Sequence, residues 1–126
     1  MTSTTDAPSG RRQALGRYGE SVAARHLADQ GMVVLDRNWR CEAGEIDLVL
    51  RDGAVLVVCE VKTRTSDAYG TPHEAITPDK LDRLKRLGAL WAEAHQVRPA
   101  ETRIDLVAVH KAQRGAAAVE HVPGLV

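Results

Sequence analysis

The sequence has no excess of charge of either sign and no long apolar run, and both absences narrow the possible functions. Lysine plus arginine and aspartate plus glutamate number 17 each, so the formal net charge is zero. A neutral chain is not expected to bind nucleic acid indiscriminately, although a local basic patch remains compatible with it. No apolar run approaches the ~20 residues of a membrane span, and no signal-peptide pattern is present. We therefore expect a cytoplasmic protein with no membrane partner.

Cysteine is scarce as well. Cys41 and Cys59 have neither CxxC spacing nor a neighbouring histidine cluster, which argues against a structural zinc site. Cys59 lies in an apolar run, where a small core residue is expected. A chain of 126 residues can bury a core without disulfides. The sequence predicts a disordered polar tail over residues 1–10 and one domain over residues 11–126.

The most informative stretch is residues 44–62, GEIDLVLRDGAVLVVCEVK. Two apolar segments flank Asp52-Gly53, a dipeptide typical of tight hairpin turns. The second segment, Val55 to Cys59, is apolar on both faces, as in a central strand that is covered on both sides. The first segment is expected to turn Ile46, Leu48 and Leu50 toward the same face. The stretch therefore predicts a β-hairpin at the centre of a sheet.

Charged side chains gather on one face of this hairpin. Side chains alternate along a strand, so Glu60 and Lys62 point the same way. With Asp52-Gly53 as the turn, Glu45 faces Glu60, and Asp47 lies diagonally from Glu60 with Cα atoms roughly 7–8 Å apart. Charges at the end of a central strand are costly unless they are paired or bind something. Three acids and a lysine predict a site for a hard cation such as Mg²⁺.

Further elements flank the hairpin. Gly31 is a typical helix C-terminal glycine, and Thr77-Pro78 is a typical helix start. A polar loop over residues 63–72 leaves the charged end of the central strand. The order helix, strand, hairpin, helix, strand predicts an α/β sandwich around a small mixed sheet, an αβββαβ core. The predicted ranges are a helix over 11–30, an edge strand over 32–38, a helix over 78–95, a strand over 102–110 and a short edge strand over 119–122.

Four residues of the two helices have unusual positions. Glu20 lies at the border of the apolar stripe of the first helix, so it is either a surface acid or one that leans toward the sheet. Gly16 and Gly19 are poor helix formers, which suggests close packing against the sheet. Lys80 lies within the apolar stripe of the second helix. Its side chain either extends past the helix end to solvent or reaches the same site as Lys62.

The chain resembles the PD-(D/E)xK nuclease superfamily, in which an acid on one strand precedes an acid-x-Lys on the next. Within that superfamily it closely resembles the YraN family of small, largely uncharacterised bacterial proteins, over residues 16 to 110. GEIDLV followed by EVKTR is the most specific part. Cys59 and Ile104 depart from the usual pattern, both as core substitutions. The matching pieces are residues 19–27, 37–40, 44–49, 60–64, 74–76, 80–84 and 103–109.

The resemblance implies a restriction-endonuclease-like fold and a metal-dependent nuclease. Asp47 and Glu60 would ligate Mg²⁺ or Mn²⁺, with the carbonyl of Val61 as a further ligand. Lys62 would position or activate the attacking water, or neutralise charge that develops on the phosphate. Glu20 would act through an outer-shell water or a second metal. The implied substrate is DNA, including branched DNA or repair intermediates. The resemblance does not exclude RNA as the substrate, and it is compatible with an active homodimer.

Three functions fit these residues. The first is the nuclease; the second is a non-catalytic module that binds nucleic acid or a protein partner; the third treats Glu60 and Lys62 as a structural ion pair. One lysine cannot neutralise three clustered acids, which weighs against the third. The neutral charge favours weak or partner-dependent binding. The basic residues that could contact a phosphate backbone, each equally explicable as a solvated charge, are Arg17, Arg40, Arg64, Lys80 and Arg83.

Overall fold

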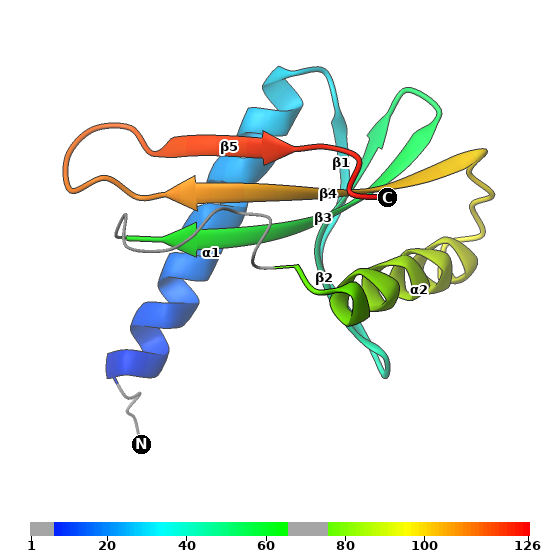
Figure 1. The fold of residues 1–126 in the computed structure, drawn as a ribbon, viewed down its shortest axis with the longest axis horizontal. Helices are drawn as coiled ribbons and strands as arrows, with labels where there is room; N and C mark the ends of the chain where they lie inside the picture. The colour runs from blue at the N-terminus through cyan, green and yellow to red at the C-terminus, as the bar shows by residue number, and fades with distance from the viewer. Residues whose placement is uncertain (1–6, 66–75) are drawn as a thin grey trace.

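A computed structural model describes residues 7–65 and 76–126, which form two helices and one five-stranded sheet. The strands are ordered in the sheet as they are in the chain (Figure 1). The first three strands form an antiparallel meander, the third and fourth are parallel, and the fifth is antiparallel to the fourth. The elements are α1 (Ala7–Asp29), β1 (Val33–Cys41), β2 (Gly44–Asp52), β3 (Val55–Arg64), α2 (Pro78–Ala94), β4 (Glu101–His110) and β5 (Ala118–Val122).

The two helices cover opposite faces of the sheet. Alternate residues of β3 belong to different apolar clusters: Val57 and Cys59 pack in the cluster that contains α1, and Leu56 and Val58 pack in the cluster that contains α2. In Figure 1, α1 crosses the sheet diagonally, whereas α2 lies beside the turn between β1 and β2. The predicted mixed α/β architecture, with a central strand buried on both faces, is confirmed. Cys59 is a buried core residue, as expected.

Most element boundaries differ from the predictions by a few residues. Helix α1 begins at Ala7, so the predicted tail is too long; residues 1–6 lie outside the described ranges. Strand β1 is an edge strand, as predicted, but it continues to Cys41. Strand β3 continues to Arg64, and residues 66–75, which held most of the predicted loop, are not described. The Thr77 cap and the β5 edge strand are confirmed. Neither helix is long and apolar enough to cross a membrane.

The predicted hairpin turn is wrong by one residue. Asp52 pairs with Val55, so the turn residues are Gly53 and Ala54 rather than Asp52 and Gly53. Asp52 stays in the strand, where its carboxylate accepts a hydrogen bond from Arg103 Nη1 at 3.1 Å. Gly53 takes the positive φ of 62° that the turn requires. The register therefore shifts by two residues, which leaves the paired residues 48–52 and 55–59 on their predicted faces of the hairpin but changes their neighbours.

The pairing of β2 with β3 ends where the charged residues begin. The last pair is Leu48 with Cys59, and the following residues on the two strands are Asp47 and Glu60. Beyond this point β2 pairs only with β1. Ile46 packs in the α2 cluster, while Leu48 packs in the α1 cluster, so the predicted shared face is wrong. Ile46 belongs to the part of β2, residues 44–47, that is paired with β1 and not with β3.

Gly19 brings α1 into close contact with the end of β3. A Cβ atom at residue 19 would clash with Thr63 Oγ1 and lie 2.9 Å from Thr63 Cβ, whereas a Cβ at Gly16 would meet nothing within 4 Å. The prediction of close packing thus holds for Gly19 and is wrong for Gly16. We expect Gly19→Ala to lower the free energy of unfolding by about 2 kcal/mol. Gly16→Ala, the control, should raise it by roughly 0.5–1 kcal/mol.

Guanidinium-induced unfolding of both variants measures the difference. Equal effects of the two substitutions would contradict the close approach of α1 to β3. Since Gly19 directly precedes Glu20, this contact also fixes where the Glu20 side chain starts.

Candidate functional site

Asp47 and Glu60 come together where β2 and β3 separate. Asp47 Oδ2 accepts a hydrogen bond of 2.8 Å from the backbone N–H of Val61. This bond links the two strands just beyond their last paired residues, and it holds the Asp47 carboxylate against the backbone next to Glu60. In the observed register the two acids follow the last pair, Leu48 with Cys59, at equivalent positions on the two strands, and not in the diagonal relation predicted from the sequence.

Glu60 binds two lysines through one oxygen. Its Oε2 atom lies 3.2 Å from Lys62 Nζ and 2.6 Å from Lys80 Nζ, and Glu60 is only 8% exposed. Lys62 comes from the same strand, whereas Lys80 comes from the first turn of α2. Of the two predicted alternatives for Lys80, the structure therefore supports the one in which its side chain reaches the site of Lys62.

The acids of the site destabilise one another as charged groups. Burial, and then the charge of Glu60, raise the pKa of Asp47 to about 7, against the hydrogen bond from Val61. Glu20 and Glu45 add smaller contributions in the same direction. Burial also raises the pKa of Glu20, partly offset by a hydrogen bond with Asn38. Burial is the largest cause of both shifts, and the neighbouring acids add to it.

The two lysines on Glu60 respond in opposite directions. Burial, followed by the contact with Lys80, lowers the pKa of Lys62 despite the nearby carboxylate. Burial also acts to lower the pKa of Lys80, but hydrogen bonding to Glu60 and Lys62 outweighs it, and the pKa is raised. The shorter ion pair, from Lys80, is the one that holds its proton more firmly.

The remaining predicted residues are placed around this cluster. Glu20 is half-buried on α1 and near enough to Asp47 to shift its pKa. The prediction that Glu45 faces Glu60 is wrong, because the register of the hairpin is shifted. Glu45 lies opposite Arg40 on β1, with 3.4 Å between Arg40 Nε and Glu45 Oε2. Arg17 is exposed on α1.

Two further predicted basic residues lie on other elements. Arg64 is half-buried at the end of β3, and its Nη1 donates to Thr63 O at 3.3 Å. Arg83 is exposed on α2, with its Cδ near Gly44 of the β1–β2 turn. Among the predicted basic residues, Lys80 contacts Glu60 at 2.6 Å and Arg40 contacts Glu45 at 3.4 Å.

Asp47 and Glu60 suit a divalent cation better than the predicted three-acid set does. Within residues 7–65 and 76–126 no group of three or more histidine, cysteine, aspartate or glutamate side chains is arranged to hold a metal ion. Glu45 therefore does not form a three-acid metal site with Asp47 and Glu60. Mg²⁺ sites commonly use only one or two carboxylates, with water and substrate phosphates as the other ligands. The two carboxylates of Asp47 and Glu60, the first with its pKa raised by burial and then by the charge of the second, match that donor set.

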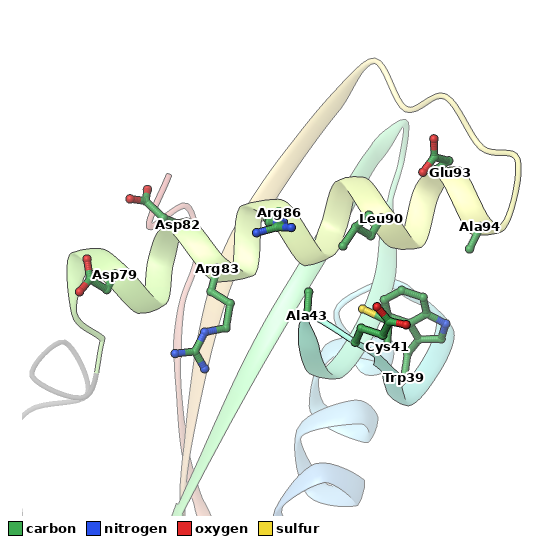
Figure 2. A pocket seen from close by; sticks show the side chains of 11 residues that line it. Trp39, Cys41, Ala43, Asp79, Asp82, Arg83, Arg86, Leu90, Glu93 and Ala94 are labelled. Atoms are coloured by element: carbon green, nitrogen blue, oxygen red, sulfur yellow. The ribbon is translucent and has the colours of Figure 1, made fainter.

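A groove of about 1030 Å³ lies near the site without including it. Its walls are the outer face of α2 and the end of the β1–β2 hairpin, with Arg83 and Trp39 on opposite sides (Figure 2). Arg83 is the only predicted site residue that lines it. Asp47, Glu60, Lys62 and Lys80 are absent from the lining.

Sequence analysis missed a second polar cluster, around Asp105. This residue of β4 is 0% exposed and accepts hydrogen bonds from Arg103 Nε at 2.8 Å, Arg103 Nη2 at 3.0 Å and the N–H of Gly124 at 3.0 Å. His121 Nε2 lies 2.8 Å from Asp105 Oδ2. Burial acts to raise the pKa of Asp105, but these partners outweigh it and lower the pKa. The sequence feature that could have indicated this cluster is the acid Asp105 itself, which stands between Ile104 and Leu106 in an otherwise apolar strand.

The fold and the site together define a mixed α/β protein with a carboxylate–lysine cluster at the point where two central strands separate. The chain belongs to the family described as "Uncharacterised protein family UPF0102", whose profile matches residues 19–109. That range includes the described site residues Glu20, Asp47, Glu60, Lys62 and Lys80.

Bacterial relatives match over nearly their whole length. A UPF0102 protein of a Nocardioides species is 60% identical over 122 residues, covering 97% of this chain and 98% of the relative. The Kineococcus radiotolerans protein is 57% identical over 115 residues, covering 90% and 94%. The Streptomyces coelicolor protein is 55% identical over 121 residues, covering 94% and 93%. All three carry the family designation and no activity.

Proposed function

We propose that this protein is a metal-dependent nuclease that hydrolyses phosphodiester bonds in DNA, including branched or repair intermediates. We assign it a restriction-endonuclease-like fold of the PD-(D/E)xK superfamily, as the resemblance to the YraN family implies. The observation that carries the proposal is the meeting of Asp47, Glu60 and Lys62 at the end of the β2–β3 pairing. A structural ion pair would need only Glu60 and one lysine.

The proposed reaction is the hydrolysis of one phosphodiester bond by a water molecule. The oxygen of a water molecule forms a bond to phosphorus, the bond to one ester oxygen breaks, the water loses a proton and the departing oxygen gains one. Asp47 and Glu60 would hold Mg²⁺ or Mn²⁺, with the Val61 carbonyl as a further ligand. When bound, this ion would polarise the phosphoryl oxygens and lower the pKa of a coordinated water.

Two side chains would assist the reacting groups. Lys62, beside Glu60, would orient the attacking water or stabilise the charge that builds on the phosphate. Glu20, on the neighbouring helix, would act through an outer-shell water or a second metal. The charge of Glu20 contributes to the raised pKa of Asp47, after burial and the charge of Glu60, and this interaction supports the assignment.

Incubating the purified protein with end-labelled duplex, single-stranded, flapped and branched DNA tests the proposal. We expect cutting in Mg²⁺ or Mn²⁺ and none in EDTA. Lys62→Met should lower the cutting rate by about 10²–10³-fold, a typical loss for one catalytic group. Lys85→Met is the control, because Lys85 is an exposed lysine of α2 whose only described partner is Asp82, at 4.0 Å.

One result would replace the proposal with its alternative. DNA bound without cutting under every metal condition would indicate a non-catalytic nucleic-acid-binding module on a nuclease-like fold. The neutral net charge of the chain is the observation that favours this second candidate. RNA oligonucleotides in the same assay distinguish DNA from RNA as the substrate.

A further inference from the structure

Lys80 occupies a helix position that local helix rules disfavour. Thr77 is the N-cap of α2, its Oγ1 accepts the N–H of Lys80 at 3.1 Å, and Pro78 begins the helix. A capping box places glutamate or glutamine at the position that Lys80 takes. A cation in the first turn also faces the positive end of the helix dipole. The helix alone therefore does not account for this lysine.

The contact with Glu60 does account for it. Lys80 Nζ lies 2.6 Å from Glu60 Oε2, closer than Lys62 Nζ at 3.2 Å, and the Lys80 side chain is only 27% exposed. Both lysines contact the same atom, Glu60 Oε2. Glu60 is also one of the two carboxylates proposed to bind the metal ion. A metal ion bound by this oxygen would take the place of a lysine, since like charges at such distances repel.

We propose that Lys80 is a second active-site lysine, which occupies Glu60 until a divalent cation binds there and then contacts the phosphate of the substrate. The first half needs only the metal site; the second half rests on the proposed nuclease function. Lys80 suits exchange better than Lys62 does. Lys62 is tied to Glu60 by its position two residues along the same strand, whereas Lys80 reaches in from the end of another element.

Once a cation occupies Glu60, the Lys80 ammonium would still be attracted by the charge of Asp47, which keeps it near the site. A substrate phosphate at the site would be the new anion for it to contact. A lysine ammonium binds phosphate as a point charge and does not need one fixed orientation. Lys80 would thus neutralise the carboxylate in the free protein and the phosphate in the complex.

Lys80→Gln is the informative variant. Glutamine satisfies the capping box with Thr77, so the start of α2 is preserved while the charge is removed. Lys85→Gln is the matched control, from the same helix and 48% exposed. Titration of MgCl₂ into each protein by calorimetry, without DNA, measures the first half. Cutting of the best DNA substrate at saturating Mg²⁺ measures the second.

We expect opposite changes in the two measurements. Lys80→Gln should bind Mg²⁺ about fivefold more tightly, because a competing cation is gone, and should cut about tenfold more slowly. Lys85→Gln should change neither. Saturable Mg²⁺ binding by Lys80→Gln, when the wild type shows none, would be the same result in stronger form. A lysine that only pairs with Glu60 would not slow cutting at saturating Mg²⁺ when it is removed.

Three outcomes overturn the inference, and they separate it from the proposed function. Equal or weaker Mg²⁺ binding by Lys80→Gln contradicts the exchange, even if the wild type cuts DNA. Tighter binding with an unchanged cutting rate contradicts the contact with phosphate. Absence of Mg²⁺ binding in both proteins contradicts the exchange and the proposed metal site together. Tighter binding in a protein that cuts no DNA supports the exchange while the nuclease proposal fails.

Discussion

Replacing Asp47 with asparagine is expected to lower the rate of DNA cutting by about 10⁴-fold or more while the protein stays folded. Asparagine keeps an oxygen that can accept the Val61 N–H, so the link between β2 and β3 is retained. It removes the negative charge that a metal ion needs. Single-turnover cutting, together with circular dichroism, measures both effects. Glu45→Gln, on the exposed acid opposite Arg40, is the control and should keep most of the activity.

The same substitution should stabilise the metal-free protein at alkaline pH. The pKa of Asp47 is raised to about 7 in the fold, compared with about 3.9 in an unfolded chain. Between these values the folded protein binds more protons than the unfolded one, so this residue lowers stability as pH rises from about 4 to 7.

Asp47→Asn removes that loss. In EDTA, we expect its free energy of unfolding to match the wild type near pH 4 and to exceed it by about 2 kcal/mol near pH 8. Urea unfolding at the two pH values measures the difference. A variant less stable than the wild type near pH 8 would mean that the Asp47 charge supports the fold, as in a structural ion pair.

Asp105→Ala is expected to lower the free energy of unfolding by about 3–5 kcal/mol, the largest stability loss we predict. The substitution leaves the Arg103 guanidinium and the Gly124 N–H without their buried acceptor and removes the neighbour of His121. The C-terminal segment is tied to β4 through these bonds and through the pairing of Leu125 with Ile104. We therefore expect this segment and β5 to loosen first.

Guanidinium unfolding and hydrogen exchange at the C-terminal amides measure the effect of Asp105→Ala. Asp52→Ala is the matched control, because Asp52 also binds Arg103, at 3.1 Å, but is 44% exposed. Its removal should cost less than about 1 kcal/mol. Equal losses from the two substitutions would show that the Asp105 network is not what holds the C-terminal segment.

The faces of the paired residues of β2 and β3 could be predicted from the sequence because they depend on a period of two, whereas the face of Ile46, outside that pairing, could not. The predicted turn was misplaced by one residue, which moved the register by two, and Asp47, Glu60 and Lys62 stayed together. The start of α2 was predictable for a similarly local reason, since Thr77-Pro78 carries the capping signal in its own chemistry.

Features that depend on distant residues could not be predicted. Asp52 remains in its strand because Arg103 of β4 binds it. The choice between the two positions of the Lys80 side chain depended on how α2 docks against β3. The buried position of Asp105 depends on its contacts with His121 and Gly124. These residues belong to the C-terminal segment, whose pairing with β4 the sequence only weakly indicated.

The most direct test of the central claim, that Asp47 and Glu60 form a metal site, is calorimetric titration of Mg²⁺ and Mn²⁺ into the wild type and Asp47→Ala. The account predicts saturable binding by the wild type and its loss in the variant, with proton release because a carboxylate of raised pKa must ionise. Binding that persists unchanged in Asp47→Ala would place the metal elsewhere. No binding at millimolar metal by either the wild type or Lys80→Gln would contradict the proposed metal site.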